Sequence, residues 1–185
     1  MKEKIYFVSS NKVKIAEMMY LFDNSLEVVD YDCQEIQGSP EEVCKDKLLK
    51  AQKKLEKDII VVCDDFCVFE GLYDFPGVYL KDFLRMGFKK IESIVEKVGR
   101  RFKMSTILGL YYKGDVNFFY GSYSGYIHLR EGIEDQMSIN PLLMIEETGK
   151  FFTDFTFEEL CKNNHRKKAA DKLKEYFKSK NFDYK

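Results

Sequence analysis

The sequence has no excess of charge of either sign and no long apolar run. Its 30 basic and 31 acidic residues give a formal net charge of -1. Overall charge therefore does not favour a nucleic acid or an anionic membrane as the partner. No segment is long enough to span a bilayer, and the start of the chain lacks the apolar core of a signal peptide. We expect no nucleic-acid partner and no membrane partner, so any anion site must be built locally.

The cysteines also lack the pattern of a disulfide framework. There are five of them, an odd number, scattered along the chain, and Cys63 and Cys67 do not form a C-x-x-C pair. Such a distribution is typical of reduced, mostly buried thiols in a cytosolic protein. The expected localisation is therefore cytoplasmic. The five residues are Cys33, Cys44, Cys63, Cys67 and Cys161.

What the chain does contain suits a globular protein. It has 185 residues, of which 45% are hydrophobic and 33% are charged. This length can bury a sizeable core within one domain, and we find no internal repeat, low-complexity tract or linker. The sequence predicts a single domain over residues 1–185.

A short apolar run, Ile59–Cys63, ends in the adjacent carboxylates Asp64 and Asp65. Such a run is typical of a strand buried on both faces of an α/β sheet, and ligands bind where such strands end. Two neighbouring carboxylates repel each other unless a cation lies between or beside them, and Mg²⁺ prefers a few carboxylates plus substrate phosphates. Alternatively, the pair only begins a turn, a role that Asp fills well.

The N-terminal segment predicts a strand followed directly by a helix. Residues Ile5–Val8 form an apolar run, and Ser9-Ser10-Asn11 offers N-cap side chains before apolar residues at helical spacing. The turn places free N–H groups and the positive helix end together, with charge added by Lys12 and Lys14. It is not a Walker loop, because the glycines are absent. The alternative is two solvated lysines on a first helical turn.

A second strand is predicted over residues 26–31, followed by a loop that contains Glu35. The next residues have the form of a capping box, with Ser39 at the N-cap, Pro at the first helical position and Glu42 at the third. The carboxylate of Glu42 therefore has a structural explanation, because it can reach back to the N–H of Ser39. Glu35 lies outside the box and has no such explanation.

The second half of the chain predicts helices around 80–86 and 88–98, then a hairpin of two long strands, 104–112 and 116–129. Gly121 and Gly125 interrupt the second strand, where a bulge or a close backbone approach is expected.

The chain ends with helical patterns. One covers residues 156–161, and the next follows Asn164, a suitable N-cap. This places His165 and Arg166 at the positive end of a helix, where they form either an anion or base-edge site or simply a solvated pair.

Five motifs occur in an order that resembles the inosine triphosphate pyrophosphatase family, in particular its eukaryotic branch. The first matches a strand followed by T-x-N-x-x-K, and the fourth matches G-x-x-x-G-x-I. The resemblance extends from about Ile5 to Leu173. The motifs lie at residues 7–14, 35–42 with Lys47 downstream, 62–65 followed by 75–81, 121–127 and 162–166.

This resemblance implies an α/β fold with a long mixed β-sheet flanked by helices, two lobes and a nucleotide cleft, and usually a homodimer. It implies a hydrolase that converts non-canonical purine nucleoside triphosphates (ITP, dITP, XTP) to the monophosphate and pyrophosphate. The implied cofactor is Mg²⁺, with Mn²⁺ as an alternative. It implies that Glu35 and Asp65 hold the metal and that Asp65 also orients or deprotonates the attacking water.

The resemblance also assigns the substrate contacts. Asn11 and Lys14 would act in catalysis and bind the triphosphate, and a hydrogen-bond donor such as Arg166 would favour a keto oxygen at position 6 of the purine. The implied phosphate contacts are Ser9, Ser10, Asn11, Lys14, Lys47 and Lys81, and the implied base contacts are Asn140, Lys162, His165 and Arg166.

The chain departs from the family where the base pocket is expected. An F-G-[YW]-D-P motif is replaced by Met137-Ser138-Ile139-Asn140-Pro141. Stacking of a base on an aromatic ring contributes about 1–3 kcal/mol, so Met137 and Ile139 should hold a purine less firmly. Asn140 can both donate and accept, which loosens base discrimination. The alternative function is therefore a nucleotide-binding homologue with weak or shifted activity.

Overall fold

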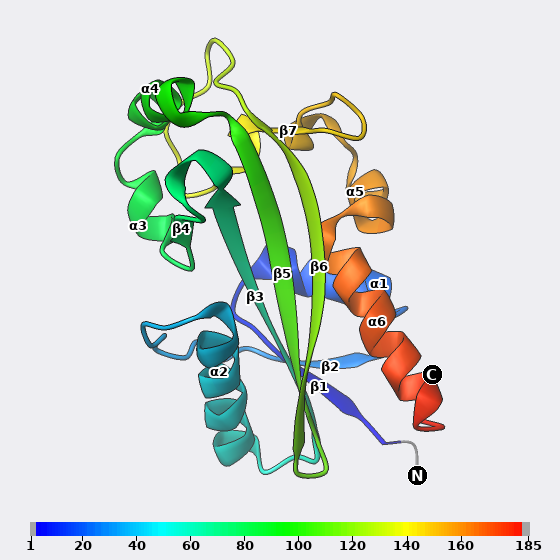
Figure 1. Ribbon diagram of the computed structural model, residues 1–185. Coiled ribbons are helices and arrows are strands. Elements are labelled where there is room, and N and C mark those ends of the chain that lie inside the picture. The colour runs from blue at the N-terminus through cyan, green and yellow to red at the C-terminus, as the bar shows by residue number, and fades with distance from the viewer. Residues whose placement is uncertain (1–2, 183–185) are drawn as a thin grey trace. The chain divides into compact units, whose positions relative to one another are not determined.

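The computed structural model describes residues 3–182, which form a mixed α/β structure (Figure 1). Seven strands share one sheet with the order β2-β1-β3-β5-β6-β7, and β4 pairs with β3. Strands β1 and β2 are parallel, whereas β6 and β7 are antiparallel. The predicted fold class, a mixed sheet with helices beside it, is confirmed.

The chain forms two compact units. The first contains residues up to Asp64, residues 106–121 and residues from Asn164 onward, and the second contains residues 65–105 and 122–163. The prediction of one functional domain stays a prediction, since two compact units can share one function. Three long strands contribute to both units: β3 (Ile59–Phe69), β5 (Arg101–Tyr112) and β6 (Asp115–Ile127).

The first unit packs helices on both faces of β3. Residues Val61 and Cys63 of β3 belong to the core that also contains residues of α1 and α6, whereas Val62 points to the other face, where Cys44 of α2 lies against Gly109. A Cβ at Gly109 would come within 2.8 Å of the Cys44 sulfur. The elements of this unit are β1 (Ile5–Val8), α1 (Lys12–Leu21), β2 (Leu26–Val29), α2 (Pro40–Leu55) and α6 (His165–Ser179).

Strand β3 does not end at the carboxylate pair. It continues through Asp64 and Asp65 to Phe69, because residues Cys67 and Val68 pair with β4. The alternative in which the two Asp residues begin a turn is therefore wrong. The two Asp residues do not end the strand, because residues 66–69 continue it. The strand continues because a second partner strand satisfies its backbone groups beyond the carboxylates.

Two local predictions are confirmed in detail. Ser39 Oγ accepts the N–H of Glu42, and the Glu42 carboxylate accepts the N–H of Ser39 at 2.8 Å, which makes the capping box complete. The backbone bond from Ser39 lowers the pKa of the Glu42 carboxyl. Strands β5 and β6 are joined by Lys113-Gly114, both with positive φ, as a two-residue hairpin turn requires.

The second unit has its own core, rich in aromatic side chains, among them Phe69, Phe83 and Phe102. Gly125 of β6 lies so close to β7 that an added Cβ would come within 2.0 Å of the Met144 carbonyl oxygen, so the predicted close approach is confirmed. The elements are β4 (Pro76–Gly77), α3 (Leu80–Leu84), α4 (Phe88–Val98), β7 (Leu143–Ile145), α5 (Phe157–Asn163) and 3₁₀ turns at Glu70–Leu72, Asn140–Leu142 and Phe152–Asp154.

All five cysteines are buried thiols outside any disulfide, as predicted. Burial, followed by the charge of Asp64, raises the pKa of the Cys44 thiol, and burial alone raises that of Cys67. Both thiols are therefore protonated near neutral pH and behave as small apolar side chains. Within residues 3–182, no helix is both long enough and apolar enough to cross a membrane.

Candidate active site

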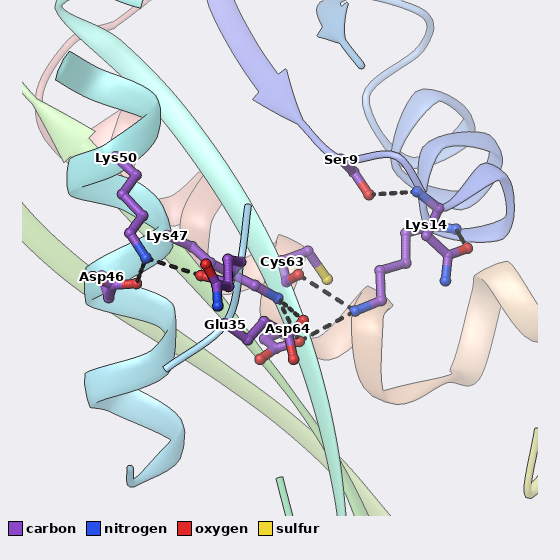
Figure 2. A network of polar contacts seen from close by, with 10 residues as sticks. Ser9, Lys14, Glu35, Asp46, Lys47, Lys50, Cys63 and Asp64 are labelled. Carbon is purple, nitrogen blue, oxygen red and sulfur yellow. Dashed lines mark hydrogen bonds and ion pairs between the residues drawn. The ribbon is translucent and has the colours of Figure 1, made fainter. Parts of the chain in front are cut away.

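The ammonium group of Lys47 is the centre of a charged cluster in the first unit (Figure 2). Lys47 extends from α2, and its Nζ lies 2.7 Å from Glu35 Oε1 and 3.2 Å from Asp64 Oδ1. Glu35 comes from the loop before α2, and Asp64 comes from β3. Three segments that are separate in the sequence therefore meet at one cation.

Lys14 approaches the same carboxylate from α1 (Figure 2). Its Nζ lies 3.6 Å from Asp64 Oδ1 and 3.4 Å from the carbonyl oxygen of Cys63. The side chains of Lys14 and Asp64 are each 13% exposed. The alternative of solvated lysines is therefore wrong for Lys14, whereas Lys12 on the same helical turn is exposed.

Asp64 explains how the carboxylate pair is tolerated. Successive side chains of a strand point to opposite faces, so Asp64 shares the face of Val62, toward α2, where its Oδ1 meets Lys47. The sequence predicted a cation between or beside the two carboxylates, and the two ammonium groups beside Asp64 meet that requirement. The sequence reasoning gave Asp64 no role of its own, although the pair itself was the signal.

Opposing effects act on the Lys47 side chain. Burial lowers its pKa, but the charge of Asp64 and the hydrogen bond to Glu35 outweigh this, so the pKa is raised above the ordinary lysine value. Lys47 therefore stays charged at neutral and mildly alkaline pH. Its contribution to stability is present below the ordinary lysine pKa and is lost as the pH rises through the raised one.

The turn between β1 and α1 has the predicted cap. Asn11 is the N-cap of α1, and its Oδ1 accepts the N–H groups of Val13 (3.0 Å) and Lys14 (3.2 Å). Ser9 Oγ in turn accepts the N–H of Asn11 at 3.2 Å, while Ser10 is exposed. This network fixes the backbone from which Lys14 extends toward Asp64.

The acidic side chains fit a magnesium ion only in part. Among residues 3–182, no three His, Cys, Asp or Glu side chains gather as a complete metal cage. However, Glu35 and Asp64 both direct an oxygen at one cation, Lys47 Nζ. Carboxylates in this number suit Mg²⁺, which takes one or two protein carboxylates and completes its shell with water and substrate phosphates.

At the start of α6, His165 and Arg166 are buried rather than solvated, at 3% and 4% exposure. The Nη1 group of Arg166 donates to Glu17 of α1. Glu17 Oε2 also accepts from the side chain of Asn164, at 2.6 Å. Glu17 was missed in the sequence, where a charged residue in the apolar pattern of α1 could have revealed it.

The backbone at the start of α6 lies directly against β6. A Cβ at Gly121 would come within 1.9 Å of the His165 carbonyl oxygen and 2.6 Å of the Ala169 nitrogen. The close backbone approach predicted at Gly121 is therefore confirmed. It fixes the first turn of α6, which carries His165 and Arg166.

The remaining predicted contacts lie in the second unit on separate elements. Lys81 is exposed in the first turn of α3, and Lys162 is exposed in the last turn of α5. Asn140 opens a 3₁₀ turn. Of the two residues that replace the family's aromatic side chains, Met137 is 58% exposed, but Ile139 is 2% exposed and belongs to the core.

The comparisons with known proteins cover nearly the whole chain. The inosine triphosphate pyrophosphatase of Encephalitozoon cuniculi is 34% identical over 95% of this chain and 94% of its own length. The dITP/XTP pyrophosphatase of Pyrococcus horikoshii is 28% identical over 95% of this chain and 97% of its own length. The solved structure of a HAM1 protein from Coxiella burnetii is 17% identical in sequence and superimposes with a TM-score of 0.77, covering 95% of this chain and 99% of its own. The two proteins therefore share the fold.

The family model called Ham1 family matches residues 5–176. This confirms the resemblance that the five motifs indicated. The chain belongs to the Ham1 family.

Proposed function

We propose that this protein hydrolyses non-canonical purine nucleoside triphosphates, such as ITP, dITP and XTP, to the monophosphate and pyrophosphate. The observation that carries this proposal is the likeness to inosine triphosphate pyrophosphatases along almost the full length of both chains. The cluster around Lys47 supports it, because it gathers the cations that a triphosphate needs in a protein whose net charge is only -1.

The lysines of the cluster are the proposed phosphate contacts. Lys14 and Lys47 are charged, largely buried and fixed by Asp64 before any substrate arrives. Cations that are already in place stabilise developing charge without the cost of reorganisation. The side-chain amide of Asn11 can donate to a phosphate oxygen while its Oδ1 keeps the helix capped. Ser9, Ser10 and Lys81 complete the proposed phosphate contacts.

Glu35 and Asp65 are the proposed ligands of Mg²⁺, with Mn²⁺ as an alternative. When bound, the metal would neutralise charge on the triphosphate and its leaving group. Lys47 Nζ lies 2.7 Å from Glu35 Oε1. This ion pair keeps the Glu35 carboxylate beside Asp64 and next to the strand that carries Asp65.

The proposed reaction is attack of water on the α-phosphorus, with release of pyrophosphate. Asp65 is the group proposed to orient this water and accept its proton, a role that a positioned carboxylate can fill. Lys14 and Lys47 would interact with the negative charge that develops on the leaving pyrophosphate. This division gives Asp64 the task of holding the lysines and Asp65 the task of acting on water.

The proposed base contacts are Asn140, Lys162, His165 and Arg166. Arg166 has five N–H donors, and its bond to Glu17 fixes the guanidinium plane. A fixed donor directed at position 6 would accept a keto oxygen and reject an amino group. We also propose a cytoplasmic location and a homodimer, and sedimentation velocity of the purified protein tests the dimer.

A second candidate is a nucleotide-binding homologue with weak turnover. The substitution of the stretch Met137–Asn140 favours it, because an exposed Met and a buried Ile cannot form the stacking platform of the family motif. The ordered cluster around Lys47 favours the enzyme instead, since binding alone does not require the acidic pair.

Pyrophosphate release from a panel of ITP, XTP, dITP, GTP and ATP, with Mg²⁺ and with a chelator, tests the proposal. We expect faster hydrolysis of ITP, XTP and dITP than of GTP and ATP, and loss of hydrolysis on chelation. Tight nucleotide binding without any release of pyrophosphate would favour the second candidate. Release of orthophosphate only would contradict the proposed bond cleavage.

A further inference from the structure

Helix α4 holds the chain segment between β6 and the 3₁₀ turn at Asn140 by two separate hydrogen bonds. At the start of the segment, the N–H of Leu129 donates to Glu92 Oε2 at 3.2 Å. Further along, Asp135 Oδ1 accepts the N–H of Phe88 at 2.6 Å. Both acceptors are carboxylates, and hydrogen bonds to charged groups are the stronger kind. All of these residues belong to the second unit.

Asp135 supplies an N-cap that α4 lacks in its own sequence. The N-cap position is Gly87, which has no side chain and a φ of 86°. A Cβ at Gly87 would come within 2.7 Å of Asp135 Oδ2. The glycine therefore leaves room for the carboxylate of Asp135, which lies 48 positions further along the chain. The negative charge also suits the positive end of the helix.

Glu92 is itself fixed on both sides. Its Oε1 accepts from Arg100 Nη1 at 2.5 Å, and the same Nη1 donates to the Ile127 carbonyl oxygen at 2.9 Å. Arg100 and Glu92 thus link the end of β6 to α4 and leave Oε2 for Leu129. The segment begins at a defined place because its first residues are held by a charged pair that is three-quarters buried.

The segment has little regular structure of its own between these points and Asn140. Ile139 is buried in the core that also contains Phe88 and Ile91 of α4, whereas Met137 is exposed. We propose that Asp135 and Glu92 are positioning residues, which fix residues 129–140 on α4 and thereby place Met137 and Asn140 for the nucleotide base. This inference rests on the proposed function.

Kinetics of four variants test the inference. Asp135→Ala removes the cap, and Asp135→Asn keeps an acceptor oxygen and should rescue it. Glu92→Ala removes the other anchor, and Glu96→Ala is the matched control, because Glu96 lies on α4 and binds Arg100 without contacting the segment.

We expect KM for ITP to rise about fivefold in Asp135→Ala and Glu92→Ala, because fewer molecules hold the segment in the binding-competent arrangement. The kcat should stay within about twofold of the parent, since the reacting groups are untouched. Asp135→Asn and Glu96→Ala should resemble the parent. An unchanged KM in Asp135→Ala, or an equal rise in Glu96→Ala, would overturn the inference.

Hydrogen exchange of the nucleotide-free protein gives a second measurement that does not depend on activity. Amides of residues 129–140 should exchange faster in Asp135→Ala than in the parent, while amides of β1 and α6 do not change. Exchange at parent rates in the segment would overturn the inference even if KM rose. If the parent hydrolyses no nucleotide, the proposed function fails, and exchange alone decides whether Asp135 and Glu92 order the segment.

Discussion

The two units hold their proposed functional side chains in different ways. In the first unit, Lys14, Lys47 and Asp64 extend from two helices and a central strand and are bound to one another. In the second unit, Lys81 and Lys162 are exposed, and Asn140 opens a short turn. A buried charge without a partner is costly. Substitutions in the first arrangement are therefore expected to destabilise the protein more than substitutions in the second.

The difference explains where the sequence departs from its family. Replacing one residue of the Lys47 cluster removes a partner from largely buried charges, which is costly. The stretch Met137–Asn140 carries no such constraint, apart from the need for an apolar side chain at the buried position 139. Sequence variation in the stretch Met137–Asn140 can therefore alter the proposed base contacts and leave the Lys47 cluster unchanged.

The largest expected effect follows from replacing Asp65, the carboxylate proposed to act on water. Asp65→Asn should reduce kcat by at least about 10³-fold, because the variant lacks a base for the water, while the protein stays folded. Asp64→Asn should instead lower the melting temperature and raise KM, since it loosens Lys14 and Lys47. Circular dichroism and steady-state kinetics separate these cases. Near-parental hydrolysis by folded Asp65→Asn would remove this residue from its proposed role.

A large loss of stability is expected from a substitution in the first unit. Glu17→Ala leaves Arg166 buried without its carboxylate, which should destabilise the protein by about 3–5 kcal/mol. Replacing both residues by Met should restore much of this, because an apolar pair of similar volume avoids the unpaired charge. Urea denaturation measures both effects. Equal stability of the single and the double variant would show that the pair is not coupled.

A smaller effect on substrate binding is expected in the second unit. Met137→Phe should lower KM for ITP by about tenfold or less and change kcat little, because stacking acts in the ground state and the transition state alike. Ile139→Phe should fail to do so and should destabilise the core by about 1–3 kcal/mol through overpacking. If the parent protein already has a low KM and high selectivity for ITP, and Met137→Phe does not change them, another residue supplies the surface on which the base stacks.

The smallest effect is expected from the capping box. Glu42→Gln keeps an acceptor for the Ser39 N–H, so activity and stability should change little. Glu35→Gln weakens the partner of Lys47 and the proposed metal ligand, so it should raise the Mg²⁺ concentration needed for half-maximal rate. Magnesium titrations of the two variants test the contrast, and equal kinetic losses would contradict the division of roles between the two glutamates.

The sequence by itself determined the features that depend on near neighbours. The capping box at Ser39, the N-caps Asn11 and Asn164, and the positive-φ turn after β5 follow from residues within one turn of one another. Gly121 and Gly125 indicated close approaches, because a missing side chain in a long strand requires a neighbour or a bulge. The ordered motifs identified the family, which the comparisons confirm.

Only the tertiary structure decided which charged groups meet. The packing of α1 and α2 against β3 brings Lys14 and Lys47 to Asp64. Burial of α6 against α1 pairs Arg166 with Glu17. Helix periodicity and turn preferences act over a few residues, whereas these pairs join residues between 17 and 149 positions apart. The pairing of these residues depends on how whole helices and strands pack, and local sequence patterns do not predict that packing.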